Sequence, residues 1–242
     1  MLFVMVLGYS AEQVRAAEAP LLAAGEPLMR RAAGGLAEEL RRVLNTRHRR
    51  VDGAVQRRLL LLVGPGNNGG DTMFAGAELA AGGTSVSIVP TGSRMHEESL
   101  AAALRAGARL KADADADMVS RLASGADIVV DGILGTGTSA ENPALRGRAR
   151  ELVAAILPVL DHPIRPDVVA VDLPSGIDPD DGSVPDPVVL PADLTVTFGA
   201  VKAGLLLEPA RRLAGEVRVI DIGLGPHLER VEPLVRTRDH GP

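Results

Sequence analysis

The sequence predicts an α/β protein with a three-layer Rossmann-like fold, in which a mostly parallel sheet is flanked by helices and preceded by an N-terminal helical extension. Short apolar runs alternate with longer amphipathic segments, as strands and crossover helices do in this architecture. Most of these runs are apolar at consecutive positions, which is typical of strands covered by helices on both faces. The length of 242 residues fits one such domain and leaves little room for a second.

The N-terminal part of the chain predicts two helices. Ser10 and Gln13 have the spacing of a capping box, and the alanine-rich segment 11–24 that follows is expected to be a helix ended by Gly25. A second helix is expected over residues 27–45.

The remainder of the chain predicts alternating strands and helices. Six apolar runs are expected to be strands, at residues 59–63, 85–89, 127–130, 168–171, 194–198 and 217–220. Three intervening segments are long enough for crossover helices, at residues 71–81, 96–107 and 143–157. The segment 111–117, in which Asp alternates with Ala, is expected to be a solvated loop. The domain is expected to span residues 1–235, with 236–242 as a tail or the start of a linker.

The composition favours a small soluble ligand over a large anionic partner. The net charge of -5 gives no electrostatic reason to expect nucleic acid or an anionic membrane surface. The apolar run at residues 1–7 follows no basic stretch and is far too short for a membrane span, so we expect an N-terminal extension. The sequence contains no Cys, which excludes disulfides and thiolate metal sites and agrees with a cytoplasmic protein.

The strongest local signal is the segment 64–71, GPGNNGGD, which lies directly after one apolar run and directly before a helical pattern. Glycines at such a turn let the backbone approach a ligand closely. The free amides and the positive dipole end of the following helix favour anionic groups such as phosphate. The segment therefore predicts a binding loop.

Two further apolar runs end in a carboxylate, because Asp131 follows the run 127–130 and Asp172 follows the run 168–171. The carboxyl ends of parallel strands form the ligand crevice of an open sheet. We therefore expect polar side chains from distant segments to meet there, namely Asn68, Asp71, Asp131, Asp172 and Ser175.

Several of these groups are hard oxygen donors. The Asn68 amide, the Asp131 carboxylate and the Ser175 hydroxyl suit an alkali or alkaline-earth cation and do not suit zinc or copper. A monovalent cation beside the ligand is one interpretation. The segment 135–139, GTGTS, is a second glycine-rich stretch suited to phosphate or ribose groups.

A dehydrogenase is the weaker interpretation of the same glycines. Gly64, Gly66 and Gly69 have the G-x-G-x-x-G spacing, but the next expected strand ends in the residues 89–92, VPTG, where the fingerprint needs an acidic residue for the ribose hydroxyls. The polar side chain of Asp71 also has no purpose in a plain dinucleotide turn.

Taken together, these motifs resemble the NAD(P)H-hydrate epimerase family, the YjeF N-terminal domain, over nearly the whole chain. The resemblance rests on six ordered blocks: YSAEQVRAAEAP from Tyr9, GEPLMRRAA from Gly25, VGPGNNGGD from Val63, DGILGTG from Asp131, VDLPSGID from Val171, and ADLTVTFGAVKAGLLL through GEVRVIDIG from Ala192. Thr72 stands where Gly is more usual and Ala203 where Pro is common, and neither departure removes a ligand group.

The resemblance implies an isomerase of nicotinamide cofactor repair, which interconverts the R and S forms of hydrated NADH and NADPH at C6 of the nicotinamide ring. It implies substrate contacts at Asn67, Asn68, Gly69, Gly70, Asp71, Gly135, Thr136, Gly137, Thr138, Ser139, Ala140, Glu141 and Asp172. It also implies one potassium ion per subunit, held by Asn68, Asp131 and Ser175, and no organic cofactor.

For the chemistry, we expect Asp172 to act as acid or base at the C6 hydroxyl, with Asp71 as the alternative proton carrier. Lys202 also matches the family pattern and is expected either to neutralise a substrate phosphate or to be a surface lysine. The resemblance further implies a homodimer, with the N-terminal helices as candidate contact surface, and an ADP- or ATP-dependent dehydratase as functional partner. A non-catalytic binding module of the same fold is the alternative.

Overall fold

The protein is built on a seven-stranded sheet in which every neighbouring pair of strands is parallel. A computed structural model describes residues 5–46, 56–137 and 143–238. The strand order is β4-β3-β2-β5-β6-β7-β9, with β2 (Arg58–Val63), β3 (Ser85–Pro90), β4 (Arg109–Leu110), β5 (Ile128–Gly132), β6 (Asp167–Val171), β7 (Leu194–Phe198) and β9 (Glu216–Ile220). The predicted Rossmann-like α/β fold is confirmed, and all six predicted strands are present.

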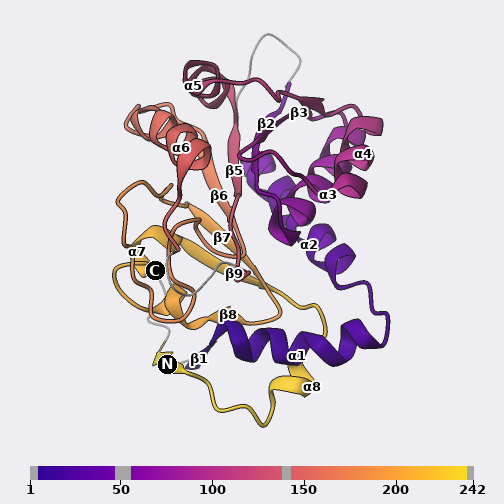
Figure 1. Ribbon diagram of the computed structural model, residues 1–242, viewed down its shortest axis with the longest axis vertical. Coiled ribbons are helices and arrows are strands. Elements are labelled where there is room, and N and C mark those ends of the chain that lie inside the picture. Colours follow the sequence, from indigo (N-terminus) through magenta and orange to yellow (C-terminus); the bar gives the residue numbers. More distant parts are fainter. Residues whose placement is uncertain (1–4, 47–55, 138–142, 239–242) are drawn as a thin grey trace.

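Helices cover both faces of this sheet, as Figure 1 shows. One layer contains α2 (Leu28–Thr46), α3 (Asn67–Ala81) and α4 (Glu97–Arg105), and the other contains α5 (Ala116–Gly125) and α6 (Gly147–Leu160). Successive residues of a strand point to opposite faces, so Leu61 packs in the first layer and Leu60 in the second. The consecutive apolar residues in the sequence follow from this double burial.

The prediction of a solvated loop at residues 111–117 is wrong in its second half. Asp115 caps α5 by accepting a hydrogen bond from the Met118 amide at 2.8 Å, and Asp117 lies in the first turn. Carboxylates are stabilising at a helix N-terminus, so the alternating Asp and Ala residues mark a helix start.

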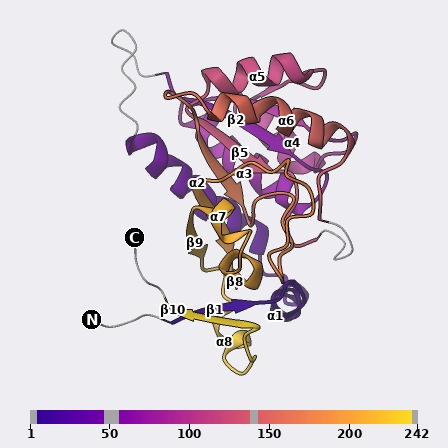
Figure 2. The same ribbon diagram turned by 90° about the vertical axis from the view of Figure 1, so that its left-hand side faces the viewer.

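A second, three-stranded sheet joins the two ends of the chain (Figure 2). Its central strand β1 (Met5–Tyr9) pairs antiparallel with β10 (Val235–Arg238) and parallel with β8 (Val201–Lys202). The predicted tail from residue 236 is therefore wrong for residues 236–238, which gain backbone hydrogen bonds to β1 that the sequence pattern does not reveal. The predicted N-terminal extension likewise contains a strand.

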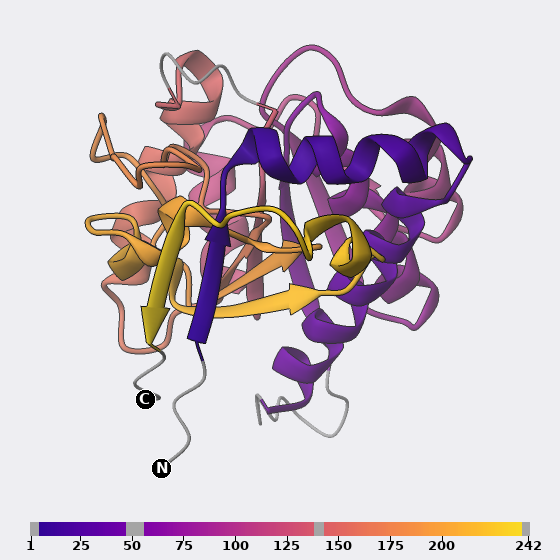
Figure 3. The same cartoon turned by 90° about the horizontal axis from the view of Figure 1, so that it is seen from below.

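Helix α1 (Ala11–Ala23) crosses the molecule beyond the carboxyl ends of the parallel strands, as Figures 1 and 3 show. The predicted capping box is present, with both the Ser10 and the Gln13 side chains hydrogen-bonded to the opposite backbone. The Asp180 carboxylate, in a loop after β6, accepts a hydrogen bond from the Ala11 amide at 2.7 Å. The start of α1 is thus tied to the edge of the sheet that it crosses.

The remaining elements are short. They are the 3-10 helix η1 (Ala203–Leu206), α7 (Arg211–Ala214) and α8 (Gly225–Leu228). Among the helices of the described residues, none has the length and apolar content needed to cross a membrane.

Candidate active site

A cavity of about 410 Å³ lies between α1 and the carboxyl ends of the parallel strands. It brings together seven of the predicted substrate-binding residues, namely Asn67, Asn68, Asp71, Gly135, Thr136, Gly137 and Asp172. Gly69 and Gly70 are buried in the first turns of α3 and do not line it. Thr138, Ser139, Ala140 and Glu141 lie outside the described residues.

The glycine-rich turn between β2 and α3 is packed too tightly for larger residues. A Cβ atom on Gly64 would lie 1.8 Å from the Ile133 carbonyl oxygen, and one on Gly69 would lie 2.1 Å from the Gly64 carbonyl oxygen. The close packing sets the N-terminus of α3 at the cavity wall, where its free amides favour an anionic ligand group. Thr72 donates a hydrogen bond to the Asn68 carbonyl oxygen at 2.7 Å, which stabilises the same turn.

Asp71 is a buried carboxyl group that faces this cavity. Its side chain is 8% exposed, and its buried Oδ1 atom has no hydrogen-bond partner among the described residues. Burial raises the pKa of Asp71 to about 8, and the negative charges of Asp172 and Glu18 act in the same direction. Asp71 therefore holds a proton at neutral pH, which is unusual for a carboxyl group and suits a general acid.

Asp172 lies directly beyond the end of β6 and is held there by three hydrogen bonds. Its Oδ1 atom accepts from the Lys202 ammonium at 2.5 Å and from the Thr197 hydroxyl at 3.2 Å, and its Oδ2 atom accepts from the Thr136 amide at 3.3 Å. The backbone of Asp172 is left-handed, with φ of 69°, which a non-glycine residue adopts at a cost. The surrounding contacts fix this strained conformation at the cavity.

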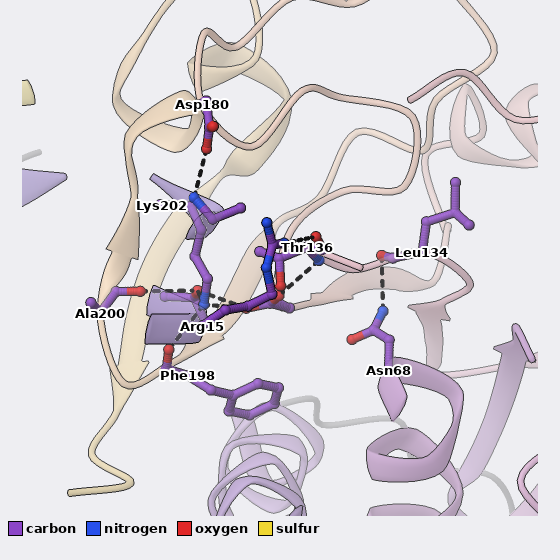
Figure 4. A network of polar contacts seen from close by, with 11 residues as sticks. Arg15, Asn68, Leu134, Thr136, Asp180, Phe198, Ala200 and Lys202 are labelled. Atoms are coloured by element: carbon purple, nitrogen blue, oxygen red, sulfur yellow. Dashed lines mark hydrogen bonds and ion pairs between the residues drawn. The ribbon is translucent and has the colours of Figure 1, made fainter. Parts of the chain in front are cut away.

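Lys202 is not the surface lysine of one expectation, because its side chain is buried and already bonded, as its contact with Phe198 in Figure 4 illustrates. Its ammonium donates to the Asp172 carboxylate, to the Thr197 hydroxyl at 3.1 Å and to the Phe198 carbonyl oxygen at 2.9 Å. Three donors are thereby used, which leaves none for a substrate phosphate.

Behind the cavity wall, a hydrogen-bonded chain connects the three predicted cation ligands through Leu134. The Asn68 amide donates to the Leu134 carbonyl oxygen at 2.9 Å, and the Leu134 amide donates to the Ser175 hydroxyl at 2.9 Å. The Ser175 hydroxyl donates to the Asp131 carboxylate at 2.6 Å. Asn68, Asp131 and Ser175 are thus brought together, although they come from three different segments.

Asp131 is a buried carboxylate without a positive partner. Burial raises its pKa, while hydrogen bonds from Ser175 and the Ile133 amide oppose that rise. In the part of the chain that the structure describes, no lysine or arginine forms an ion pair with it, and no group of three or more His, Cys, Asp or Glu side chains forms a metal site. A buried carboxylate normally requires compensation by charge or hydrogen bonds, so a single cation held by neutral oxygens suits this position.

Two further cavity residues were missed by the sequence argument, and both come from α1. The Arg15 guanidinium donates to the Thr136 carbonyl oxygen at 2.8 Å, and the half-buried Glu18 carboxylate lines the cavity with it. Burial raises the pKa of Glu18, the nearby Lys202 and Arg15 lower it, and Asp172 raises it. A polar residue at the end of an apolar run can be recognised from sequence. A polar residue on a helix that crosses the sheet edge cannot, because its own helix pattern does not show where the helix lies.

The fold and this cavity define the chain as a Rossmann-like α/β domain with a cavity at the carboxyl edge of the sheet, where open parallel sheets bind their ligands. Residues 25–204 match the family model described as YjeF-related protein N-terminus. The chain belongs to this YjeF N-terminal family.

Two relatives agree with that membership, and a solved structure shares the fold. The chain is 51% identical to an NAD(P)H-hydrate epimerase of Clavibacter michiganensis subsp. michiganensis, over 95% of both chains. It is 40% identical to the bifunctional NAD(P)H-hydrate repair enzyme Nnr of Mycobacterium tuberculosis, over 89% of this chain and 41% of that enzyme. The crystal structure of yeast ynu0, YNL200c, shares the fold, with a TM-score of 0.68 and 19% identity over 81% of this chain and 82% of that one.

Proposed function

We propose that this protein interconverts the R and S forms of hydrated NADH and NADPH at C6 of the nicotinamide ring. The observation that carries the proposal is the buried Asp71, whose Oδ1 atom has no hydrogen-bond partner among the described residues, beside the anchored Asp172 in a cavity that begins at a glycine-rich turn. Relatives at 50% identity and above that are named NAD(P)H-hydrate epimerase support the same reaction. A dehydrogenase is less well supported, because the segment 89–92 at the end of β3 brings no acidic residue to the cavity.

In the reaction, the Asp71 carboxyl group gives its proton to the C6 hydroxyl. The C6–O bond then breaks, its electron pair leaves on the departing water, and the lone pair of the ring nitrogen forms a double bond to C6. Water adds to the other face of the planar carbon, and its surplus proton passes to a carboxylate of the cavity. Atoms and charges balance, and no oxidant or reductant is needed.

Asp172 is the second polar group of this reaction centre. We place it as a hydrogen-bond acceptor for the substrate and keep it as the alternative acid or base, because its carboxylate reaches the cavity while Lys202 and Thr197 orient it. Lys202 is a positioning residue, since its ammonium donates its hydrogen bonds to Asp172, Thr197 and Phe198.

The dinucleotide phosphates and ribose would lie along the two glycine-rich segments. The N-terminus of α3 at Asn67 supplies free amides, and Gly135, Thr136 and Gly137 line the cavity beside it. A Cβ atom on Gly135 would approach the Asn68 side chain to 3.2 Å, so a larger residue would require Asn68 to shift. The segment 138–141, which the resemblance adds to the site, remains a proposal.

A potassium ion fits the Asn68, Asp131 and Ser175 cluster. The donors are one carboxylate and two neutral oxygens, which suit a monovalent hard cation. When bound, such an ion would neutralise Asp131 and fix the loop at Leu134 that leads to Gly135 and Thr136. One ion per subunit, and no organic cofactor, completes the proposed composition.

The cellular setting follows from the proposed substrate. We propose that a dehydratase dependent on ADP or ATP consumes the S form, as the fused architecture of relatives named bifunctional repair enzymes suggests. We also keep the homodimer and the cytoplasmic location as proposals, which light scattering and cell fractionation would test.

The proposed function is tested by following R-to-S conversion of purified hydrated NADPH on a chiral or reversed-phase column. We expect the protein to speed conversion far above the spontaneous rate and to reach the same equilibrium from either epimer. A non-catalytic binding module would retain the dinucleotide and leave the conversion at the spontaneous rate. That outcome would reject the epimerase.

A further inference from the structure

A third carboxylate, Glu18, shares the cavity with Asp71 and Asp172 but comes from a different direction. Glu18 lies on α1, which crosses beyond the strand ends, whereas Asp71 lies on α3, which starts at those ends (Figures 1 and 3). The charge of Glu18 contributes to the raised pKa of Asp71, so the two groups interact across the cavity.

Glu18 is also free to handle a proton. In the part of the chain that the structure describes, its carboxylate forms no hydrogen bond or ion pair, unlike the neighbouring Arg15, which is bonded to Thr136. The charged groups around Glu18 are Lys202 of β8, Asp172 of the β6 end, Arg15 of its own helix, and Asp71 of α3. Burial is the largest influence on the pKa of Glu18 and raises it.

The proposed reaction needs proton transfer on two faces of one carbon. Water leaves from one face of the ring and adds to the other, and a single carboxyl group cannot reach both faces without a rotation of the bound ring. Two groups on different elements, with one proton shared between them, meet this requirement in both directions.

We propose that Glu18 is a catalytic residue of the epimerisation, which accepts or donates the proton on the ring face opposite Asp71. This inference rests on the proposed function. In one direction Asp71 protonates the departing hydroxyl and Glu18 takes a proton from the adding water, and in the other direction the roles are exchanged.

The test compares inversion at C6 with exchange of the C6 hydroxyl oxygen in water enriched in ¹⁸O. Loss and re-addition on the Asp71 face exchanges the oxygen without inversion, whereas inversion also needs Glu18. We expect Glu18→Gln to lower the inversion rate about 100-fold in both directions. We expect oxygen exchange in the epimer whose hydroxyl faces Asp71 to fall much less, so that the ratio of exchange to inversion rises for that epimer.

Two further variants complete this experiment. Glu12→Gln makes the same chemical change on the exposed side of the same helix and should leave both rates at the wild-type level. Glu18→Asp retains the carboxyl group and should recover part of the inversion. If Glu18→Gln is poorly folded by circular dichroism, the exchange-to-inversion ratio of Glu18→Asp carries the test, because a shortened side chain should also raise it.

The outcomes separate the two proposals. Equal loss of exchange and inversion in Glu18→Gln for the epimer whose hydroxyl faces Asp71, or no loss of either, would overturn the role of Glu18 while leaving the epimerase intact. An inactive wild-type protein would overturn both.

Discussion

The Lys202 ammonium lies 2.5 Å from the Asp172 carboxylate, and both residues are buried, at 2% and 7% exposure. The pair joins β8, which belongs to the small sheet, to the end of β6 in the large sheet. A buried ion pair of this kind is costly to break from one side, because the remaining charge loses its compensation. The ion pair between Lys202 and Asp172 therefore stabilises the domain and also holds Asp172 in its place at the cavity.

Removal of the lysine charge should destabilise the protein strongly. We expect Lys202→Met to lower the free energy of unfolding by about 3–5 kcal/mol, as urea denaturation would measure. The double variant Lys202→Met with Asp172→Asn should lose less stability than the sum of the two single variants. Each single variant leaves one unpaired buried charge, whereas the double variant leaves none. Additive losses would show that the pair does not interact energetically.

Asp172→Asn tests the reaction centre itself. Asn keeps the size of the side chain but removes the negative charge that Lys202 and Thr197 orient. We expect the rate of R-to-S conversion to fall about 100-fold in protein that circular dichroism shows to be folded. Unchanged turnover would end the assignment of Asp172 to the reaction.

Asp71 predicts a loss of activity at alkaline pH. Since its pKa is raised to about 8, the protonated acid is present at neutral pH and is lost as the pH rises through that value. The wild-type conversion rate should fall on this alkaline side, and Asp71→Asn should be slow at every pH and lack the alkaline limb. A wild-type rate that rises through pH 8 would contradict the role of Asp71 as acid.

The raised pKa of Asp71 should also make the free energy of unfolding depend on pH. The native state binds a proton that the unfolded state releases, so between the ordinary pKa of 3.8 and about 8 the wild-type protein should lose stability as the pH rises. The loss is at most ~1.4 kcal/mol per pH unit for this one group. Asp71→Asn has no such group, so its melting temperature should exceed that of the wild type increasingly toward pH 8, with the difference shrinking toward pH 4.

Potassium should stabilise the protein through Asp131. We expect the melting temperature to rise in potassium chloride relative to choline chloride at equal ionic strength, by a free energy of about 2.7 kcal/mol at a concentration one hundred times Kd. Asn68→Ala and Ser175→Ala should remove that difference, since each deletes an oxygen of the proposed cation site, which the hydrogen bonds through Leu134 join to Asp131. Equal melting temperatures in the two salts would reject the site.

The glycine-rich turn offers a matched pair of substitutions. Gly64→Ala would place a methyl group 1.8 Å from the Ile133 carbonyl oxygen, whereas a Cβ atom on Gly66 would have no heavy atom within 4 Å. We expect Gly64→Ala to cost at least about 1–3 kcal/mol of stability and Gly66→Ala to cost much less. Similar unfolding curves for the two variants would contradict the tight packing of the turn.

The large sheet and its cavity edge were predictable from sequence for a physical reason. Strands buried on both faces must be apolar throughout, and a parallel sheet collects its strand ends at one edge, so Asp131 and Asp172 could be placed without coordinates. The small sheet was not predictable in this way. Its strands β1 and β10 are held mainly by backbone pairing between the chain ends, as in the register Gly8 with Val235, and backbone hydrogen bonds leave little pattern in the side chains.

The environment of individual charges was equally hidden from the sequence. Lys202 matched a motif, but only the fold buries its side chain against Asp172. Glu18 belongs to a helix whose own pattern says nothing about the sheet edge that it crosses. Burial and tertiary neighbours decide the chemistry of such groups, and both depend on segments far apart in the chain.

The proposed epimerase requires that one hydrated dinucleotide binds in a single cavity, in contact with the glycine-rich turn and with the carboxyl groups of Asp71 and Asp172. A crystal structure of the protein with bound hydrated NADPH tests it most directly. We expect the phosphate groups to lie at the N-terminus of α3. We expect the C6 hydroxyl to lie within hydrogen-bond reach, roughly 2.6–3.2 Å, of Asp71 or Asp172. A dinucleotide bound elsewhere on the molecule, with the nicotinamide ring away from both carboxyl groups, would contradict it.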